Sequence, residues 1–360
     1  MKVLVIGGAT IDVITSIDTE DIECITMQNA TNSFLMLEQG KKVEAQRIDN
    51  QIGGGATNAA VAMSRLGGDV SAILKLGDDM DANRVLERLS NENVHTGYVV
   101  KVPGEQTGKS IIISSHDKNA GVFVHRGANT TLSMRDVQPE MFEGVALVYI
   151  STLSSNSADA FLPLVKLAKS KGCFVACNPG IRQIRNRKEQ MFEALQYLDL
   201  VAINKEEAAA LAEGMTCSEG AGCAHEEDCP ELIQHGLGDR DAEVSLEYLA
   251  RKVLDTGCAN FTVTNGGEGA YLATDETITF RPSVKVEVES TIGAGDAFNS
   301  TLAFALASGL DAASALTRAA INGASVAGTL DTQGGLLTKD EMSSRETEQA
   351  GVTAQEFAIL

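Results

Sequence analysis

The sequence is poor in positive charge and in aromatic side chains. It carries 29 Lys and Arg residues against 49 Asp and Glu residues, a formal net charge of −20, and only 4% of its 360 residues are aromatic. A nucleic-acid-binding surface needs a basic stripe, so this balance argues against such a partner. The overall field also repels anions, and a phosphate-bearing ligand therefore has to be held by local groups.

Long apolar runs are missing as well. No stretch approaches the length of a transmembrane helix, which argues against a membrane partner. The apolar part of the N-terminal "MKVLVIGGATIDVI" is shorter than that of a secretory signal. Seven cysteines, an odd number, are scattered through the chain. Without an export signal they indicate reduced thiols, and we expect a cytoplasmic protein.

Glycine and apolar residues, by contrast, are abundant. The 34 glycines fit a protein with many tight strand-to-helix turns. Apolar residues make up 44% of the sequence, which suffices for a sizeable core. Strand-like runs such as "KVLVIGG" and "DVSAILKLG" alternate with helix-like runs such as "ATNAAVAMSRLGG" over most of the length. This alternation predicts an α/β fold with a parallel central sheet covered by helices on both faces.

Four segments interrupt or follow this alternation. Residues 14–50 and 106–129 mix polar, apolar and turn residues, which predicts the antiparallel strands of a small β-sheet lid inserted in the larger domain. Residues 213–242 form a Gly- and acid-rich insertion. The polar stretch from Asp340 to the end of the chain is expected to be peripheral.

The stretch "STIGAGDAFNS" carries a chemical signal. Gly293, Ala294 and Gly295 precede Asp296 at the expected start of a helix. The free N–H groups of a helix N-terminus, next to residues without bulky side chains, form an anion site. A carboxylate facing that site can take a proton from a group that attacks the anion, which indicates phosphoryl transfer. A helix-capping Asp behind a glycine turn fits the same residues, and this stretch alone leaves both interpretations open.

Two longer regions, read together, decide between these interpretations. "GGGATNAAVAMSRLGG", followed by "LGDDMDA", and "STIGAGDAF" resemble the two signature regions of the ribokinase family, also called the phosphofructokinase-B family of carbohydrate kinases. The resemblance extends to Asp12 in the opening strand and to "GAN" at 127–129, and covers nearly the whole chain. It implies one ribokinase-like three-layer α/β/α domain over residues 1–360, a central mostly parallel sheet and a small β-sheet lid. The implied activity is transfer of the γ-phosphoryl group of ATP, with Mg²⁺, to a hydroxyl of a small sugar.

The resemblance also implies the site residues, each carried over at its own position. The residues that bind the acceptor are Asp12, Gly54, Gly55 and Asn58. The residues that position Mg²⁺ are Asn204 and Glu207. The residues that contact the nucleotide are Thr264, Gly266, Gly269 and Asn322. The residues of the catalytic turn are Gly293, Ala294 and Gly295 as the anion hole and Asp296 as the base.

Each of these residues has a simpler interpretation when taken singly. Asp12 and Asn58 fit caps of a turn and a helix, and Asn204 with Glu207 fits a capping box before an apolar run. Five such coincidences in the order that the family shows favour the functional interpretation. We also expect the helix N-terminus to lower the pKa of Asp296 and make it a modest base.

Two positions depart from the family pattern. Ser290 stands where many relatives have an acid that contributes to a monovalent-cation site, so activation by potassium is in doubt. Gly55 stands where sugar-specific relatives can carry a lysine, so the acceptor has no lysine contact there.

Two rival motifs are weak. "PGEQTGKS" resembles a phosphate-binding P-loop, but Pro103 replaces its first glycine and a strand follows it in place of a helix. In the insertion, three cysteines and two histidines have gaps unlike those of a zinc knuckle, and a metal there is a minor alternative. These residues are Cys217, Cys223, Cys229, His225 and His235.

The acceptor itself stays open between a hexose, a pentose, a sugar acid and a nucleoside. Asn178 at a strand end, Arg182, His125 and Asn129 are candidates to line its pocket, and Phe34 and Phe123 could stack on it. A nucleoside kinase of the same fold and an inactive sugar- or nucleotide-binding regulator are the alternative functions. A homodimer joined through the lid is the oligomer that the resemblance allows.

Overall fold

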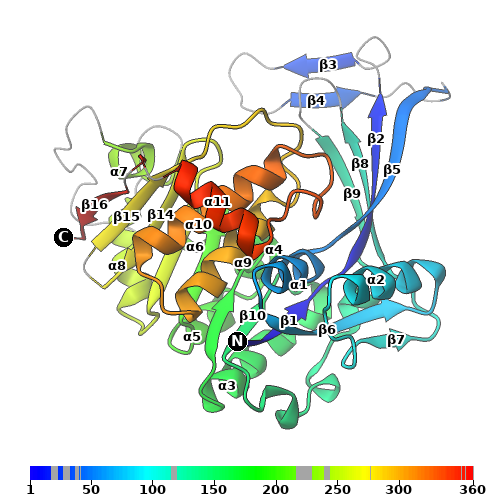
Figure 1. The fold of residues 1–360 in the computed structure, drawn as a ribbon, viewed down its shortest axis with the longest axis horizontal. Coiled ribbons are helices and arrows are strands. Elements are labelled where there is room, and N and C mark those ends of the chain that lie inside the picture. The colour runs from blue at the N-terminus through cyan, green and yellow to red at the C-terminus, as the bar shows by residue number, and fades with distance from the viewer. Residues whose placement is uncertain are drawn as a thin grey trace.

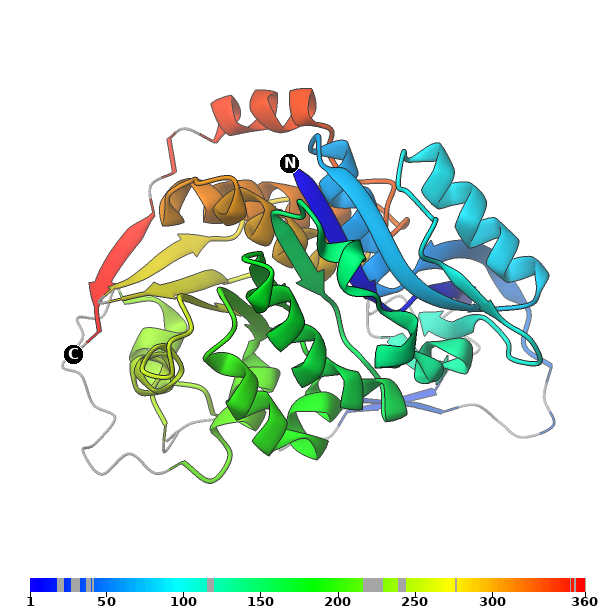
Figure 2. The same ribbon diagram turned by 90° about the horizontal axis from the view of Figure 1, so that it is seen from below.

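A computed structural model describes most of the chain. The described residues are 1–17, 23–26, 33–36, 40, 42–114, 120–215, 229–238, 244–275, 277–349, 351–352 and 354–359. They form a large sheet between two layers of helices and a smaller sheet that stands at one end of it (Figures 1 and 2). This arrangement confirms the α/β fold class predicted from the sequence, a mostly parallel central sheet with a separate small sheet.

The central sheet has ten strands among the described residues. In spatial order they are β16 (Gln355–Ala358), β15 (Thr277–Pro282), β14 (Gly269–Thr274), β13 (Asn260–Thr264), β12 (Leu200–Asn204), β11 (Phe174–Cys177), β10 (Leu147–Ile150), β1 (Lys2–Gly7), β6 (Asp69–Gly77) and β7 (Val100–Val102). The seven strands from β13 to β7 pair in parallel, and β14, β15 and β16 extend the sheet antiparallel. Strands such as β1 are apolar along nearly their whole length because both faces of the sheet are covered.

Helices cover both faces of this sheet (Figure 2). One layer consists of α1 (Gly55–Arg65), α2 (Met80–Asn91), α9 (Ala294–Ala307) and α10 (Ala312–Ala327), with α11 (Lys339–Glu348) packed on α10. The opposite layer consists of α3 (Phe161–Ser170), α4 (Ile181–Asn186), α5 (Lys188–Leu195), α6 (Lys205–Ala212), α7 (Glu231–His235) and α8 (Leu246–Leu254). Short 3₁₀ helices span Gly127–Thr131, Met134–Asp136, Pro139–Phe142 and Ser155–Ala160. Each layer buries its own apolar cluster against the sheet.

The smaller sheet is the lid. Its strands, in spatial order, are β5 (Ala45–Gly53), β2 (Thr10–Ile17), β8 (Gly108–Ser114) and β9 (Ala120–His125). A separate hairpin pairs β3 (Glu23–Thr26) with β4 (Ser33–Met36). β2 pairs antiparallel with β5 and parallel with β8, so the two sequence segments predicted to form the lid meet in one sheet. The lid rises from the end of the central sheet at which α1 begins (Figure 1).

The C-terminal segment takes a larger part in the fold than its polarity predicts. β16 pairs with β15 and extends the central sheet, and Met342 of α11 is buried against the neighbouring helix α10. The expectation of a merely peripheral segment is therefore wrong for these residues. Of the predicted insertion at 213–242, the structure describes residues 213–215 and 229–238, and α7 lies within the second of these ranges.

None of the helices that the structure describes is both long and apolar enough to cross a membrane.

Candidate active site

The carboxyl ends of the parallel strands bring the predicted site residues to one edge of the sheet. β12 ends at Asn204 and β13 ends at Thr264, and these two residues are register partners across the two strands. β1 leads through a short turn into β2, which carries Asp12. Ligands of open α/β sheets bind outside this edge, so the topology gathers residues from distant parts of the sequence at a suitable place.

Asp12 lies on the face of the lid strand β2 that is turned toward the domain. It is 6% exposed, and its Oδ1 accepts a hydrogen bond of 2.9 Å from the hydroxyl of Thr10. Burial raises the pKa of Asp12, while hydrogen bonds from Thr10 and Ser110 partly offset that effect. Ser110, its register partner on β8, was not identified from the sequence. A strand pairing between β2 and β8 is the only signal that could have found it.

The turn before α9 holds the residues of the predicted anion site. Gly293 is the N-cap residue with φ of 83°, a left-handed conformation that favours glycine, and an added Cβ would lie 2.9 Å from Cβ of Thr332. Among the described side chains none caps the first turn of α9. The N–H groups of Ala294, Gly295 and Asp296 have no acceptor within the helix, so they can bind an anion.

Asp296, in the first turn of α9, points toward the acceptor-binding turn. Its Oδ2 accepts a hydrogen bond of 2.9 Å from Nδ2 of Asn58, a buried residue of α1. An added Cβ at Gly55 would lie 3.3 Å from Oδ1 of Asp296 and 3.1 Å from Cβ of Ser151. Any side chain at Gly55 would therefore meet the candidate base, which explains why glycine fits here and lysine would not.

The carboxyl group of Asp296 has a raised pKa, contrary to the expectation from the helix N-terminus. Burial raises the pKa, the hydrogen bond from Asn58 lowers it, and the charge of Asp12 raises it further. The charged form of Asp296 loses water wherever the protein covers it. This desolvation outweighs the Asn58 hydrogen bond and the helix N-terminus, which both favour the charged form. The expectation of a lowered pKa is wrong, and Asp296 is a stronger base than an exposed aspartate.

Ser151, at the end of β10, is a further polar group beside this turn. It is 2% exposed, and its hydroxyl has no hydrogen-bond partner among the described residues. An added Cβ at Gly55 would be 3.4 Å from that hydroxyl oxygen. Its position directly after a buried parallel strand is a signal that could have been used, since such strand ends border the ligand crevice.

Asn204 and Glu207 form the reciprocal capping box that the sequence allowed as an alternative. Oδ1 of Asn204 accepts from the Glu207 backbone N–H at 2.9 Å, and Oε2 of Glu207 accepts from the Asn204 N–H at 3.0 Å. Burial is the main cause that raises the pKa of Glu207 to about 7, and the charge of Asp296 contributes. The capping box uses only Oε2 of the Glu207 carboxylate, so the same pair of residues can also bind a cation.

The donor set suits Mg²⁺ held partly by phosphates. The pKa of Glu207 is raised to about 7, mainly by burial, and a nearby cation would favour its charged form. No cluster of three or more acidic, His or Cys side chains fit to hold a metal occurs within the described ranges. Mg²⁺ commonly binds one or two carboxylates together with waters and substrate phosphates, so Asn204 and Glu207 could hold it without a larger set of protein ligands.

The predicted nucleotide residues fall into two groups. Thr264, Gly266 and Gly269 lie on the β13–β14 connection beside Asn204, where a nucleotide could run along the sheet edge. Asn322 is fully buried in α10; its Nδ2 donates to Thr301 at 2.8 Å and its Oδ1 accepts from the Leu337 N–H at 3.0 Å. With both ends of its amide bonded to protein, Asn322 ties together α9, α10 and the segment before α11. A contact between Asn322 and adenine stays a prediction.

The predicted acceptor-side residues differ in their exposure. Nδ2 of Asn178 donates to the Ala202 carbonyl, and the amide of Asn129 exchanges two hydrogen bonds with the backbone of Ala9, so both hold the fold at the site. Arg182 is exposed, and burial followed by the charge of Arg182 lowers the pKa of Arg126. The two guanidinium groups are therefore close enough for their charges to repel each other.

Other candidates lie on the surface or outside the described residues. His125 and Phe123 are exposed on β9, and the side chain of Phe34 is outside the described part. Of the minor zinc alternative, Cys217, Cys223 and His225 are likewise outside it, whereas Cys229 and His235 are described and belong to no metal-binding cluster there.

Comparisons with known proteins identify the family of this chain and its fold. The sequence profile of the pfkB family carbohydrate kinases matches residues 14–339. The bifunctional ribokinase/ribose-5-phosphate isomerase A of Fructilactobacillus sanfranciscensis is 24% identical over 302 residues, which is 84% of this chain and about half (48%) of that protein. Deoxyribokinase of Salmonella typhi is 25% identical over 298 residues, 83% of each chain.

Solved structures share the fold. A putative ribokinase II from E. coli in complex with ATP and Mg²⁺ has a TM-score of 0.74 at 17% identity, covering 96% of this chain and 99% of that one. A nucleoside kinase from Burkholderia thailandensis in complex with inosine has a TM-score of 0.73 at 18% identity, covering 97% and 99%.

The fold, the uncapped helix N-terminus and the acid beside it are the features expected of a phosphotransferase. The chain belongs to the pfkB family of carbohydrate kinases. It is an ATP-dependent carbohydrate kinase of the ribokinase type.

Proposed function

We propose that this kinase transfers the γ-phosphoryl group of ATP to a primary hydroxyl of a small sugar or sugar-like acceptor. Asp296 is the base, and the backbone N–H groups of Gly293, Ala294 and Gly295 stabilise the charge on the transferred group. The observation that carries the proposal is the hydrogen bond of 2.9 Å that joins Asn58 of the acceptor turn to Asp296 at the uncapped N-terminus of α9. Acceptor and phosphate thus have their binding groups on either side of one carboxylate.

The roles follow from the chemistry of the side chains. The acceptor hydroxyls form hydrogen bonds with the protein. The carboxylate of Asp12 accepts them, and the NH₂ group of Asn58 and the backbone at Gly54 and Gly55 complete the set of partners. Asp296 takes the hydroxyl proton as the oxygen attacks in line, and its raised pKa makes it better suited to hold that proton. A loose transition state needs the proton removed only late, so a carboxylate is a sufficient base.

Asn204 and Glu207 would hold Mg²⁺ beside the phosphates, and Mg²⁺ when bound neutralises charge that builds up on the transferred group. Thr264, Gly266 and Gly269 would line the nucleotide. Asn322 would border the adenine pocket from within α10. Ser290, whose hydroxyl accepts from the Ile292 N–H at 3.2 Å, provides no acid for a monovalent cation.

A nucleoside kinase is the second candidate function. The structural neighbour from Burkholderia thailandensis, a nucleoside kinase in complex with inosine, supports a nucleoside as acceptor, since that fold match covers 97% of this chain. An inactive binding regulator is disfavoured because Asp296, Asn204 and Glu207 are all retained.

The kinase proposal is tested by ADP release with a panel of pentoses, hexoses, sugar acids and nucleosides. Sugar acids belong in the panel because Arg126 and Arg182 lie together beside the lid. We expect ADP release to depend on one acceptor class and a phosphorylated product to be found by mass spectrometry. ATP hydrolysis at the same rate with every panel member and with none would contradict the proposal.

We also propose that the lid joins two copies of the chain. The lid exposes apolar side chains that water disfavours: Ile48 at 61%, Ile111 at 45%, Val122 at 53%, Phe123 at 63% and Val124 at 50% exposed. β9, which carries three of them, is an edge strand among the described residues. Light scattering should give a dimer for the native chain and a monomer for Phe123→Lys; a monomer for both would contradict the dimer.

A further inference from the structure

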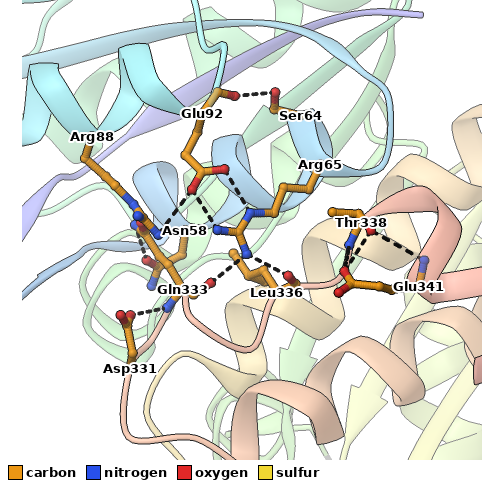
Figure 3. Close-up of polar contacts among 10 residues, drawn as sticks. All are labelled: Asn58, Ser64, Arg65, Arg88, Glu92, Asp331, Gln333, Leu336, Thr338 and Glu341. Atoms are coloured by element: carbon orange, nitrogen blue, oxygen red, sulfur yellow. Dashed lines mark hydrogen bonds and ion pairs between the residues drawn. The ribbon is translucent and has the colours of Figure 1, made fainter.

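A chain of three hydrogen bonds connects helix α2 to the candidate base. Nε of Arg88 donates to Oε1 of Gln333 at 2.9 Å, and Nε2 of Gln333 donates to Oδ1 of Asn58 at 3.0 Å. Nδ2 of Asn58 then donates to Oδ2 of Asp296 at 2.9 Å. Figure 3 shows Gln333 between Arg88 and Asn58, with the segment after α10 passing beneath α1 and α2. The four residues come from three helices and this segment, so only the folded chain assembles them.

Arg88, the first residue in this series of hydrogen bonds, fixes which group donates and which accepts in each of them. A guanidinium group only donates hydrogen bonds, so the side of Gln333 that faces Arg88 must be its oxygen. The amide nitrogen of Gln333 is then turned to Asn58, and a nitrogen requires an oxygen as its acceptor. Asn58 consequently presents Oδ1 to Gln333 and its NH₂ group to Asp296. Arg88 thereby determines that the carboxylate of Asp296 receives a donor.

Gln333 is held tightly in this place. Its side chain is 1% exposed, its N–H donates to Oδ1 of Asp331 at 2.8 Å, and its carbonyl accepts from Nη1 of Arg65 at 3.0 Å. Arg65 in turn forms a two-point ion pair with Glu92, with distances of 2.8 and 2.7 Å, and Arg88 lies 3.3 Å from the same carboxylate (Figure 3). One acid at the end of α2 therefore fixes both arginines that contact Gln333.

We propose that Gln333 and Arg88 are positioning residues of the phosphotransfer reaction: they lock the Asn58 amide in the orientation that donates to Asp296. The inference rests on the proposed role of Asp296 as base. Neither residue touches the acceptor or the phosphates; both act through Asn58. With Oδ1 bound to Gln333 and one N–H bound to Asp296, one N–H of Asn58 remains for an acceptor hydroxyl.

The orientation of Asn58 matters because the two faces of an amide favour different forms of a carboxyl group. An N–H donor stabilises the carboxylate, whereas an amide oxygen can bind only the protonated acid. A freely rotating Asn58 could bind either form, so it would favour the carboxylate less and leave more of Asp296 protonated, the form that cannot accept the hydroxyl proton. Other titratable groups act on Asp296 from elsewhere: Asp12 on β2, Glu207 on α6 and Tyr149 on β10. None of these contacts Gln333 in the described structure, so changes at Gln333 reach Asp296 through Asn58.

Three variants of the full chain test the proposal. Gln333→Met removes both polar ends without adding charge, Gln333→Glu offers only acceptors to Asn58, and Arg88→Met removes the donor that sets the direction. Arg84→Met is the matched control, because Arg84 lies one turn earlier on α2 and pairs only with Asp81 among the described residues. The readouts are the pH profile of turnover with the acceptor that the panel identifies, the KM for ATP and the thermal midpoint.

We expect Gln333→Met to lower turnover about tenfold at neutral pH, since a hydrogen bond to a charged group has been misdirected. The acidic limb of the pH profile should move to higher pH in both Gln333 variants, further in Gln333→Glu, with KM for ATP unchanged. Arg88→Met should move it in the same direction, and Arg84→Met should leave it in place. A Coulomb effect alone would spare the neutral Gln333→Met variant, so a shift there is specific to the amide orientation.

If the Gln333 variants fold and the acidic limb of the pH profile of turnover does not move, the proposal is overturned. Gln333 would then only hold the segment after α10 in place. Failure of the kinase function is recognised separately, because the native chain would then turn over no acceptor. In that case ¹³C NMR can still test whether Gln333 acts on Asp296 through Asn58. It follows the titration of the Asp296 carboxyl carbon, whose signal is assigned with Asp296→Asn. An upward shift of its midpoint in Gln333→Met supports the inference, and an unchanged midpoint contradicts it. If the Gln333 variants do not fold, Arg88→Met supplies the same comparison at a partly exposed position.

Discussion

The side chains of Asn58 and Asp296, 238 positions apart in the sequence, are joined by a hydrogen bond of 2.9 Å between Nδ2 and Oδ2. This bond connects the two glycine-containing turns of the chain, one at the start of α1 and one at the start of α9. The first turn offers polar groups to an acceptor and the second offers free N–H groups to a phosphate. The relationship therefore supports a single site in which an acceptor hydroxyl meets a phosphoryl group beside Asp296.

The pH dependence of the reaction should report the charge of Asp12. The acidic limb of turnover reflects Asp296, which must be unprotonated to act as a base, so activity rises as pH passes its pKa. The charge of Asp12 raises the pKa of Asp296, and Asp12→Asn should therefore move that limb to lower pH. Asp49→Asn, in the same lid but paired with Arg47, is the control. A limb that stays in place or moves upward in Asp12→Asn would show that the two acids do not interact.

Glu207 should affect the magnesium requirement more than stability. In Glu207→Gln the amide oxygen can still accept the Asn204 N–H, so the capping box is kept while the charge is lost. We expect a higher Mg²⁺ concentration for half-maximal activity and a nearly unchanged thermal midpoint. Glu189→Gln, at an exposed acid in the first turn of α5, should change neither. A large fall in the thermal midpoint with a normal Mg²⁺ requirement would assign Glu207 to the helix cap alone.

Potassium should activate the enzyme weakly or not at all. Ser290 is neutral and binds the backbone N–H of Ile292, so it provides no negative charge for a monovalent cation. Turnover measured in potassium and in sodium at constant ionic strength should agree closely. A many-fold rise in potassium would mean that other groups supply that charge.

Asn322 should contribute mainly to stability. Asn322→Leu leaves the N–H of Leu337 and the hydroxyl of Thr301 without their buried partner. The free energy of unfolding should fall by about 1–3 kcal/mol, the usual penalty for a buried polar group that loses its bond. Chemical denaturation measures this loss, and calorimetry measures ATP affinity in the folded variant. Unchanged stability with a strong loss of ATP affinity would favour a direct adenine contact.

Much of the architecture and part of the site follow from local sequence patterns. The strand–helix alternation predicts the parallel sheet, and Gly293 to Asp296 predicts an anion-binding helix start because glycine and an N-terminal acid have local meaning. The lid strands were predicted as two segments, and their meeting in one sheet depends on pairing between β2 and β8. Local patterns thus indicate which elements exist, and long-range pairing decides how they meet.

The remaining features depend on contacts between distant residues. Gln333 lies 275 positions from Asn58 and 245 from Arg88, in a segment whose composition gives no sign that one side chain is buried. The raised pKa of Asp296 arises from burial by other elements, which the helix N-terminus alone does not reveal. The pairing of β16 with β15 brings a polar terminal segment into the central sheet, although its sequence predicts a peripheral position.

The most direct test of the account is turnover and ATP affinity in Asp296→Asn. Asparagine keeps the shape and an oxygen that can face Asn58 but cannot accept the hydroxyl proton. Turnover should fall on the order of a hundredfold or more, the usual scale for a lost general base. ATP should bind as well as in the native chain or slightly better, because a negative charge beside the phosphates is gone. A near-normal rate in Asp296→Asn would mean that this acid is only part of a helix start, and would contradict the mechanism.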